Sequence, residues 1–146
     1  VGEIIVEGTG ELRGVEVSQN ISWLIDEAPA LSVAFACARG KSVLKNAQEL
    51  RVKECDRIAV SVAGLRAFGV KAQEREDGFE VEGADLAGGL NAAALTPNAL
   101  IDSHGDHRIA MSFATLGLKC GARIQKSEFI ATSFPNFAQI LQRLYE

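Results

Sequence analysis

Apolar and polar residues follow two alternating patterns along this chain. Short stretches of alternating apolar and polar residues indicate strands, and longer stretches with apolar residues every three or four positions indicate helices. Strands are expected at residues 3–7, 15–18, 42–44, 70–73, 79–81, 99–101 and 122–125. Helices are expected between residues 26 and 40, over about 54–68, from 106 to 117 or 121, and after 133–135. This alternation of strands and helices predicts an α/β fold.

Local signals support several of these boundaries. Pro29 suits the first turn of the first helix, and Gly40 is expected to end it. Gly69 is expected to close the second helix. The dipeptide Asp77-Gly78 predicts the turn of a hairpin that joins the strands at 70–73 and 79–81.

The two halves of the chain resemble each other in pattern. The segment from Asp26 to Gly40, followed by a strand and a helix, is echoed from Asp106 to Gly121. This spacing predicts stacked βαβαββ units whose helices share a core, one over about 1–81 and the next over about 82–146. Because the chain starts at Val1 without a Met, it is expected to be a fragment or an excised domain.

Composition narrows the class of protein. A chain of 146 residues with 47% hydrophobic and 23% charged residues is long enough for one domain with a core. A net charge of −4 argues against nucleic acid as a partner, and no apolar run reaches the length of a membrane span. The three cysteines are widely spaced, which favours a reducing cytoplasm over a disulfide framework or metal site.

Charged residues gather where the helices are expected to start. Residues 50–58 place three cations and two carboxylates in an apolar frame ahead of the second helix. Asp26 precedes the first helix, and residues 106–108, Asp-His-Arg, open the third. Helix N-termini favour anions because their backbone N–H groups are unpaired. If these three ends converge, they would bind a phosphorylated, carboxylated ligand.

Each charged group also has a purely structural interpretation. Asp26 taken alone is a typical helix N-cap. Lys53 and Arg57 lie one helical turn apart and would form a solvated face, with Glu49 and Glu54 as local partners.

The segment 103–108 allows two kinds of site. His104, Asp106 and His107 are possible metal ligands, but no distant fourth ligand accompanies them. His107 followed by Arg108 fits an anion site better, because His exchanges protons near neutral pH and Arg grips carboxylate or phosphate. Three aromatic residues are expected in the core or at an interface: Trp23, Phe35 and Phe113.

Four motifs in this order resemble the 5-enolpyruvylshikimate-3-phosphate synthase family. They lie at residues 25–29, 50–58, 106–111 and 130–135. The resemblance implies an enzyme of two domains, each an inside-out α/β barrel of three βαβαββ units. This chain would be a partial enolpyruvyl transferase domain with about two of the three units of one domain, and the remaining domain of the same enzyme would be its partner.

The resemblance also implies a reaction. The enolpyruvyl group of phosphoenolpyruvate would pass to the 5-hydroxyl of shikimate 3-phosphate with release of phosphate, in aromatic amino acid biosynthesis, and no cofactor or metal would be needed. Asp26 would be the base and Glu54 would take part in proton transfer at the methylene carbon. The substrate-binding residues would be Lys53 for shikimate 3-phosphate, Arg57 and Arg108 for phosphoenolpyruvate, His107 in the same pocket, and Glu49 on the substrate side.

Two positions depart from the family pattern. Cys55 stands where the family usually has Ser or Thr, and Thr132 stands where many members have a Lys. The second departure resembles the glyphosate-insensitive class. One alternative is the enolpyruvyl transferase that acts on UDP-N-acetylglucosamine, which lacks the Lys-Glu-x-Asp-Arg run of residues 53–57. Another is a non-catalytic ligand-binding fragment, since one half of a site excludes water poorly.

Overall fold

Two sheets form the β structure of the chain. The computed structural model describes residues 2–3, 5, 7, 10–84 and 95–145. The larger sheet has the order β1-β2-β4-β3, in which β1 is parallel to β2 and β4 is antiparallel to both of its neighbours. The smaller sheet pairs β5 with β6 in parallel. The strands are β1 (Glu16–Val17), β2 (Arg39–Leu44), β3 (Lys71–Arg75), β4 (Gly78–Ala84), β5 (Ala99–Asp102) and β6 (Ala122–Gln125).

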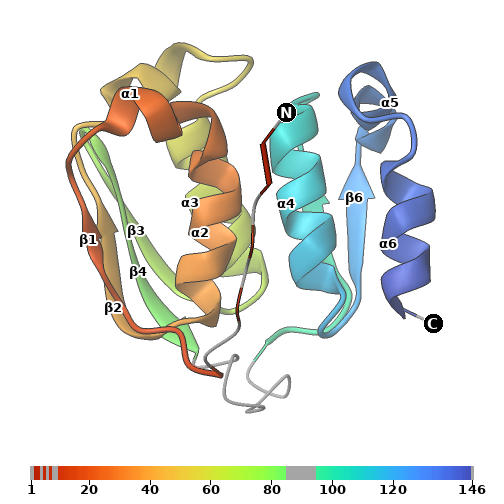
Figure 1. Cartoon of the computed structure of the whole chain (residues 1–146), viewed down its shortest axis with the longest axis horizontal. Helices are drawn as coiled ribbons and strands as arrows, with labels where there is room; N and C mark the ends of the chain where they lie inside the picture. Colours follow the sequence, from red (N-terminus) through yellow and green to blue (C-terminus); the bar gives the residue numbers. More distant parts are fainter. Residues whose placement is uncertain (1, 4, 6, 8–9, 85–94, 146) are drawn as a thin grey trace.

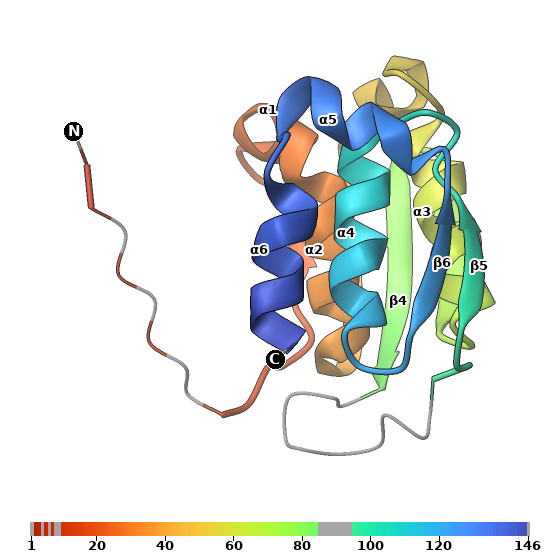
Figure 2. The ribbon, with the colours of Figure 1, turned by 90° about the vertical axis from the view of Figure 1, so that its right-hand side faces the viewer.

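The helices pack together beside these sheets. Helices α2 and α3 cover one face of the larger sheet, and α4 lies against both of them and against β5 and β6 (Figure 1). Figure 2 shows α6 on the far side of α4 from α3, and α5 at one end of α4. The α-helices are α1 (Ile21–Leu24), α2 (Ala28–Cys37), α3 (Arg57–Ala67), α4 (His107–Gly117), α5 (Ile130–Ser133) and α6 (Phe137–Tyr145), with 3-10 turns η1 (Ile25–Glu27), η2 (Gln48–Val52) and η4 (Ser127–Phe129).

The same connection occurs in both sheets. Helix α2 joins the parallel strands β1 and β2, and helix α4 joins the parallel strands β5 and β6. The larger sheet then continues through α3 to the hairpin β3–β4. The predicted α/β class is therefore confirmed, with mixed strand directions in the larger sheet.

Aromatic pairs join the layers of the core. Phe35 of α2 meets Phe79 of β4 edge-on, with ring centroids 6.2 Å apart. Phe68, which follows α3, stacks on Phe113 of α4 at 6.1 Å. Position 64 must be glycine to leave space for the Phe113 ring, because a Cβ there would lie 2.4 Å from Phe113. The core is thus continuous from the larger sheet through α2, α3 and α4.

The start of α2 is where the structure differs most from the predicted helix. Pro29 lies in the first turn as expected, but Asp26 is not the cap, because it belongs to η1 and Glu27 precedes the helix without a side-chain cap. The prediction that Gly40 ends the helix is also wrong. The helix stops at Cys37, and Gly40 lies inside β2 with φ of +91°.

The start of α3 also falls later than predicted. The helix begins at Arg57, and Asp56 caps it by accepting a hydrogen bond from the Ala59 backbone. The predicted hairpin is confirmed, but Gly78 pairs with Arg75 inside the sheet instead of forming the turn. Glycine is required there by close packing, since a Cβ would lie 2.1 Å from the carbonyl oxygen of Leu44.

Other predictions divide between confirmed and wrong. The strands at β5 and β6, the start of α4 after Asp106 and the terminal helix are confirmed. In the expected strand at 3–7, residues 4 and 6 lie outside the described residues, and 3, 5 and 7 belong to no strand. The segment 85–94 of the expected loop also lies outside them. Phe35 and Phe113 are buried, whereas Trp23 is 88% exposed within this chain.

Candidate functional site

The charged segments at the helix starts meet at one end of the molecule. In Figure 1 the N-termini of α2, α3 and α4 face the same end, near α1 and α5. Arg57 at the start of α3 contacts Asp26 from η1 and Asp106 from the cap of α4. The convergence that the sequence left open therefore occurs.

Arg57 lies at the centre of this meeting point. Its side chain is only 1% exposed, and each of its three nitrogens faces a carboxylate. Nε donates to Asp106 Oδ2 at 2.7 Å, Nη1 to Asp26 Oδ1 at 3.0 Å, and Nη2 to Glu54 Oε2 at 2.6 Å. The interpretation of Arg57 as part of a solvated face is wrong.

Asp106 is a site residue to which the sequence analysis gave no role of its own beyond opening the third helix and being a possible metal ligand. Its side chain is fully buried, and Oδ1 accepts hydrogen bonds from the backbone N–H groups of Arg108 at 2.8 Å and Ile109 at 3.3 Å. Oδ2 accepts the hydrogen bond from Arg57 Nε and lies 3.7 Å from the Cys55 thiol. The available signal was its place ahead of a helix, which predicts the cap but not the partner 49 residues away.

The exposed part of the site contains the other predicted residues. Lys53 Nζ contacts Glu49 Oε1 at 2.6 Å and lies 3.9 Å from Asp26 Oδ1. Arg108 Nη1 donates to the Asp26 carbonyl oxygen at 3.0 Å and to Glu27 Oε1 at 2.9 Å. We call the connected set the Arg57 cluster, which comprises Asp26, Glu27, Glu49, Lys53, Glu54, Arg57, Asp106 and Arg108.

His107 is the predicted site residue that the structure leaves outside the cluster. It begins α4 beside Asp106 and Arg108, and its side chain is partly buried. Within the part of the chain that the structure describes, its imidazole makes no hydrogen bond or ion pair. The same described residues contain no group of three or more His, Cys, Asp or Glu side chains that could hold a metal ion.

Burial and pairing act in opposite directions on the two innermost charges. Burial lowers the pKa of Arg57, but its hydrogen bond to Asp106 and the nearby carboxylates outweigh this, so the pKa is raised. Burial raises the pKa of Asp106, and the hydrogen bond and charge of Arg57 outweigh it, so that pKa is lowered. Both groups are therefore charged at neutral pH.

The pKa values of Cys55 and Lys53 are both raised, but for different reasons. Burial, followed by the charge of Asp106 and the hydrogen bond to it, raises the pKa of the Cys55 thiol to about 12. Cys55 is therefore a neutral thiol and not a nucleophile at neutral pH. The hydrogen bond to Glu49 raises the pKa of Lys53, which keeps this exposed amine charged.

Asp56 has a different role from its neighbours. It caps α3 and receives a hydrogen bond from Arg51 Nη1 at 2.8 Å. Arg51 also donates to the backbone carbonyls of Glu76 and Arg75, which ties η2 to the β3–β4 turn. Of the five charged residues at 50–58, two thus serve the fold and three belong to the Arg57 cluster.

The cavity beside the cluster is small. A hollow of about 150 Å³ is lined by Asp26, Glu27 and Arg108 together with residues of α2 and α4. Sites for small molecules usually measure about 300–1,000 Å³. The cluster is therefore an open wall and not an enclosed pocket.

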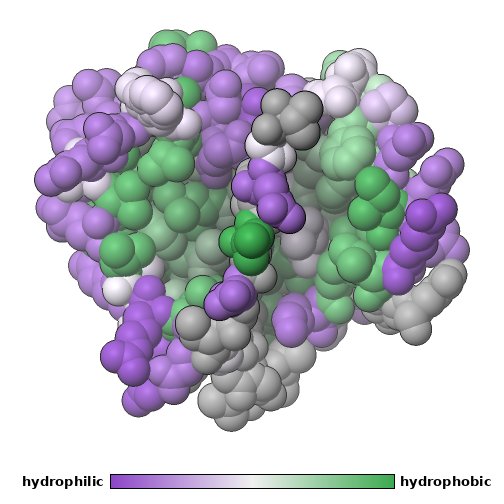
Figure 3. All heavy atoms as spheres, viewed as in Figure 1, coloured by the Kyte–Doolittle hydropathy of each residue, from purple (hydrophilic) through white to green (hydrophobic). Residues whose placement is uncertain are grey.

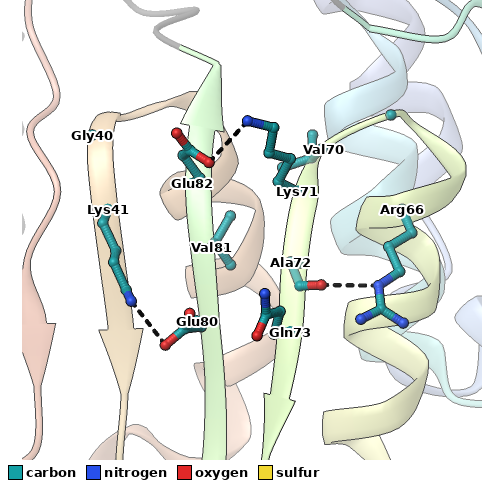
Figure 4. Close-up of a pocket in the computed structure, with 11 residues that line it drawn as sticks. Gly40, Lys41, Arg66, Val70, Lys71, Ala72, Gln73, Glu80, Val81 and Glu82 are labelled. Carbon is teal, nitrogen blue, oxygen red and sulfur yellow. Dashed lines mark hydrogen bonds and ion pairs between the residues drawn. The ribbon is translucent and has the colours of Figure 1, made fainter.

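A larger cavity lies elsewhere. A pocket of about 730 Å³ lies over β2, β3 and β4 and the end of α3 (Figure 4). Its cations are engaged locally, with Lys41 on Glu80 at 3.0 Å and Lys71 on Glu82 at 3.2 Å. We call it the sheet pocket, defined by Lys41, Arg66, Lys71, Glu80 and Glu82. None of the predicted site residues lines it.

Apolar side chains remain exposed on the face that carries α4 and α6. Figure 3 shows apolar residues on this face both beside α2 and near α6, and Ile140 and Leu144 of α6 are exposed. No helix among the described residues is long and apolar enough to cross a membrane. The three cysteines are free thiols.

Comparisons with known proteins match almost the whole chain. The profile of the family described as EPSP synthase (3-phosphoshikimate 1-carboxyvinyltransferase) matches residues 2–141. The chain is 69% identical over 133 residues to the 3-phosphoshikimate 1-carboxyvinyltransferase of Campylobacter curvus (strain 525.92), covering 91% of the chain and 29% of that protein. It is 61% identical over 144 residues to that of Campylobacter concisus (strain 13826), covering 99% and 31%.

A solved structure agrees with these relatives. An EPSP synthase from Acinetobacter baumannii superposes with a TM-score of 0.82 at 40% identity, over 91% of this chain and 30% of that chain. The chain thus spans less than a third of the length of each of these relatives.

Proposed function

We propose that this chain, which belongs to the EPSP synthase family, supplies one wall of the active site of a longer enzyme. The reaction transfers the enolpyruvyl group of phosphoenolpyruvate to the 5-hydroxyl of shikimate 3-phosphate and releases phosphate. The observation that carries the proposal is the convergence of Asp26, Glu54 and Asp106 on the buried Arg57. Such a group of acids and cations suits proton transfer next to bound anions, without a cofactor or a metal.

Two half-exposed carboxylates carry the proton transfers in this proposal. Asp26 takes the proton of the attacking hydroxyl, and Glu54 takes part in proton transfer at the methylene carbon of phosphoenolpyruvate. Both accept hydrogen bonds from Arg57, and both have side chains 50% exposed, so a substrate can reach them. General acid–base catalysis needs this combination of fixed position and access.

The cations of the wall bind the anionic groups of the substrates. Lys53 contacts the shikimate substrate, with Glu49 beside it, and Arg57 and Arg108 hold phosphoenolpyruvate. A guanidinium has five N–H donors, and three of those of Arg57 contact carboxylates. Because its side chain is only 1% exposed, phosphoenolpyruvate reaches the other two donors only if Asp26 or Glu54 moves aside. His107 lies at the edge of the same site.

The charge of the cluster indicates that this wall does not work alone. Its five carboxylates exceed its three cations, whereas both substrates are anions. Further cations must come from outside this chain if phosphate and carboxylate groups are to bind tightly. The opposite domain of the same enzyme is the proposed source.

The architecture of the longer enzyme follows the same proposal. The chain forms part of an inside-out α/β barrel, with one βαβαββ unit over about 1–81 and the next over about 82–146. The order β1-α2-β2-α3-β3-β4 supports the first unit, and the parallel pair β5 and β6 joined by α4 supports the start of the second. The exposed apolar residues of α6 would be covered by the remaining unit. The proposed location is the cytoplasm, where free thiols persist.

A hybrid enzyme tests the activity directly. In it, this chain replaces the matching segment of the Campylobacter curvus relative, and phosphate release is measured with shikimate 3-phosphate and phosphoenolpyruvate. We expect the hybrid to keep kcat within about tenfold of the parent, and the 146-residue chain alone to release no phosphate. A folded but inactive hybrid would contradict the proposed function. Turnover by the chain alone would contradict the one-wall site.

The same assay separates the alternatives. Replacing shikimate 3-phosphate by UDP-N-acetylglucosamine should abolish phosphate release, because the rival transferase lacks the Lys-Glu-x-Asp-Arg run. Binding without turnover in the hybrid would favour the non-catalytic alternative.

Glyphosate insensitivity stays a prediction. Thr132 carries a hydroxyl where many family members have an amine, and this hydroxyl donates to the Phe129 carbonyl at 2.7 Å. Strong inhibition of the hybrid by low glyphosate would contradict insensitivity.

A further inference from the structure

The contact between Arg57 and Asp106 is the most deeply buried ion pair in the described part of the chain. The two side chains are 1% and 0% exposed, and Nε and Oδ2 are 2.7 Å apart. The other oxygen of Asp106 caps α4, so the carboxylate cannot rotate without losing those backbone hydrogen bonds. One buried carboxylate therefore ties Arg57 of α3 to the first turn of α4.

We propose that Asp106 is a positioning residue that acts through Arg57, holding the guanidinium so that its terminal nitrogens stay aligned on Asp26 and Glu54. This inference rests on the proposed function, which gives those two carboxylates their proton-transfer roles. Asp106 itself is buried and touches no substrate.

Geometry explains why one contact has this effect. The guanidinium is planar, so fixing Nε and the direction of its N–H leaves little freedom for Nη1 and Nη2. Asp26 and Glu54 come from different elements, and their side chains are half exposed. Among the described residues, the Asp26 carboxylate has only two other ionic contacts, at 3.9 Å to Lys53 and to Arg108, and that of Glu54 has none, so Arg57 sets the distance between them. A displacement of about 1 Å at reacting groups costs about 100-fold in rate.

A second capping aspartate in the chain provides a matched control. Asp56 caps α3 and pairs with Arg51, just as Asp106 caps α4 and pairs with Arg57. Asp56 is 36% exposed, and Arg51 contacts none of the proton-transfer carboxylates. Substituting either aspartate by Asn keeps a good N-cap, because the amide oxygen can accept the backbone hydrogen bonds.

The kinetic test compares Asp106→Asn with Asp56→Asn in the hybrid enzyme. In Asp106→Asn the amide NH₂ faces Arg57 Nε, so that contact is lost. We expect kcat to fall about 100-fold, while KM for shikimate 3-phosphate, which Lys53 binds, changes by less than about threefold. Asp56→Asn should keep kcat within about twofold. A kcat for Asp106→Asn within about threefold of the unmutated hybrid would overturn the proposal.

A double-mutant cycle separates positioning from a general loss of folding. Arg57→Lys keeps a cation but removes the Nε contact, so Asp106→Asn should lower kcat by less than about threefold more in that background. Two independent, multiplying losses would overturn the proposal, because a merely structural aspartate would harm both backgrounds equally.

An NMR readout remains decisive even where a variant does not fold or the hybrid has no activity. In the ¹⁵N-arginine-labelled 146-residue chain, the Nε–H proton of Arg57, assigned through Arg57→Lys, should exchange with water at least about 100-fold more slowly than that of Arg13. Arg13 is a suitable reference because its side chain is exposed. Equal exchange rates would overturn the positioning role. An inactive hybrid with a protected Nε–H would instead contradict only the proposed function.

Discussion

Two regions of this molecule combine cations and carboxylates, and they differ in where the partners come from. In the sheet pocket, Lys41 pairs with Glu80 and Lys71 with Glu82, all on adjacent strands. In the Arg57 cluster, Arg57 pairs with Asp26 and Asp106, which lie 31 and 49 residues away. The pocket has the larger cavity, but the cluster has the buried charge.

That difference favours the Arg57 cluster over the sheet pocket as the candidate site. Exposed ion pairs contribute about 0–1 kcal/mol, so the sheet pocket needs no explanation beyond a solvated surface. A buried charge is costly unless it is fully paired, so the cluster exists only because three segments supply its partners. Burial of charge, and not volume of cavity, distinguishes the candidate site.

Removing the central cation should have the largest effect on stability. Arg57→Met leaves Asp106 buried without a counter-charge, so we expect the free energy of unfolding to fall by about 3–5 kcal/mol. Urea unfolding of the 146-residue chain measures it. Lys41→Met in the sheet pocket is the control and should change the value by less than about 0.5 kcal/mol. Equal losses in both variants would erase the distinction between the regions.

Removing the proposed catalytic carboxylate Glu54 should separate the regions by activity. Glu54→Gln keeps the size of the side chain and a hydrogen bond to Arg57 but cannot exchange a proton, so kcat of the hybrid should fall at least about 100-fold. Glu80→Gln should leave kcat within about twofold. Phosphate release measures both, and a matching loss in Glu80→Gln would place chemistry in the sheet pocket.

Acid should weaken the cluster through Asp106. Its pKa in the folded chain lies below the usual value of 3.8, so its contribution to stability is complete above that value and is lost as the pH falls through the folded pKa. Urea unfolding from neutral pH to about pH 2 should therefore show a shallower acid loss in Asp106→Asn than in the unmutated chain. For Glu80, whose pKa is lowered by the hydrogen bond from Lys41, the corresponding change should be smaller because Lys41 is 59% exposed.

The smallest expected effect concerns Cys55. With its pKa raised from 9.0 to about 12, the thiol should carry about 1,000-fold less thiolate than a free cysteine below pH 9. In the chain with Cys37→Ser and Cys120→Ser, alkylation by iodoacetamide should be correspondingly slow and should accelerate in urea. Cys55→Ser should keep kcat of the hybrid within about threefold. Fast alkylation of the folded chain would show that the cluster is open to solvent.

Sequence patterns predicted the local parts of the fold well. The start of α4 after Asp106, Pro29 in the first turn of α2 and the hairpin between β3 and β4 all depend on neighbours within a few positions. The errors arose where packing overrides a local signal. Gly40 lies in a strand and not at a helix end, and Asp26 turns to Arg57 instead of capping α2. Trp23, which was expected in the core or at an interface, is 88% exposed and so is not part of the core of this chain.

By itself, the sequence determined the α/β class, the start of α4 and the types of charged residue that lie near the helix N-termini, because turn and periodicity signals act over short stretches. It also contained the motifs that mark the family. Only the tertiary structure decided that Arg57 is buried, that Asp106 is its innermost partner and that Lys41 and Lys71 belong to a solvated surface. The physical reason is that the desolvation of a charge depends on segments brought together from 31 and 49 residues away, which no local pattern records.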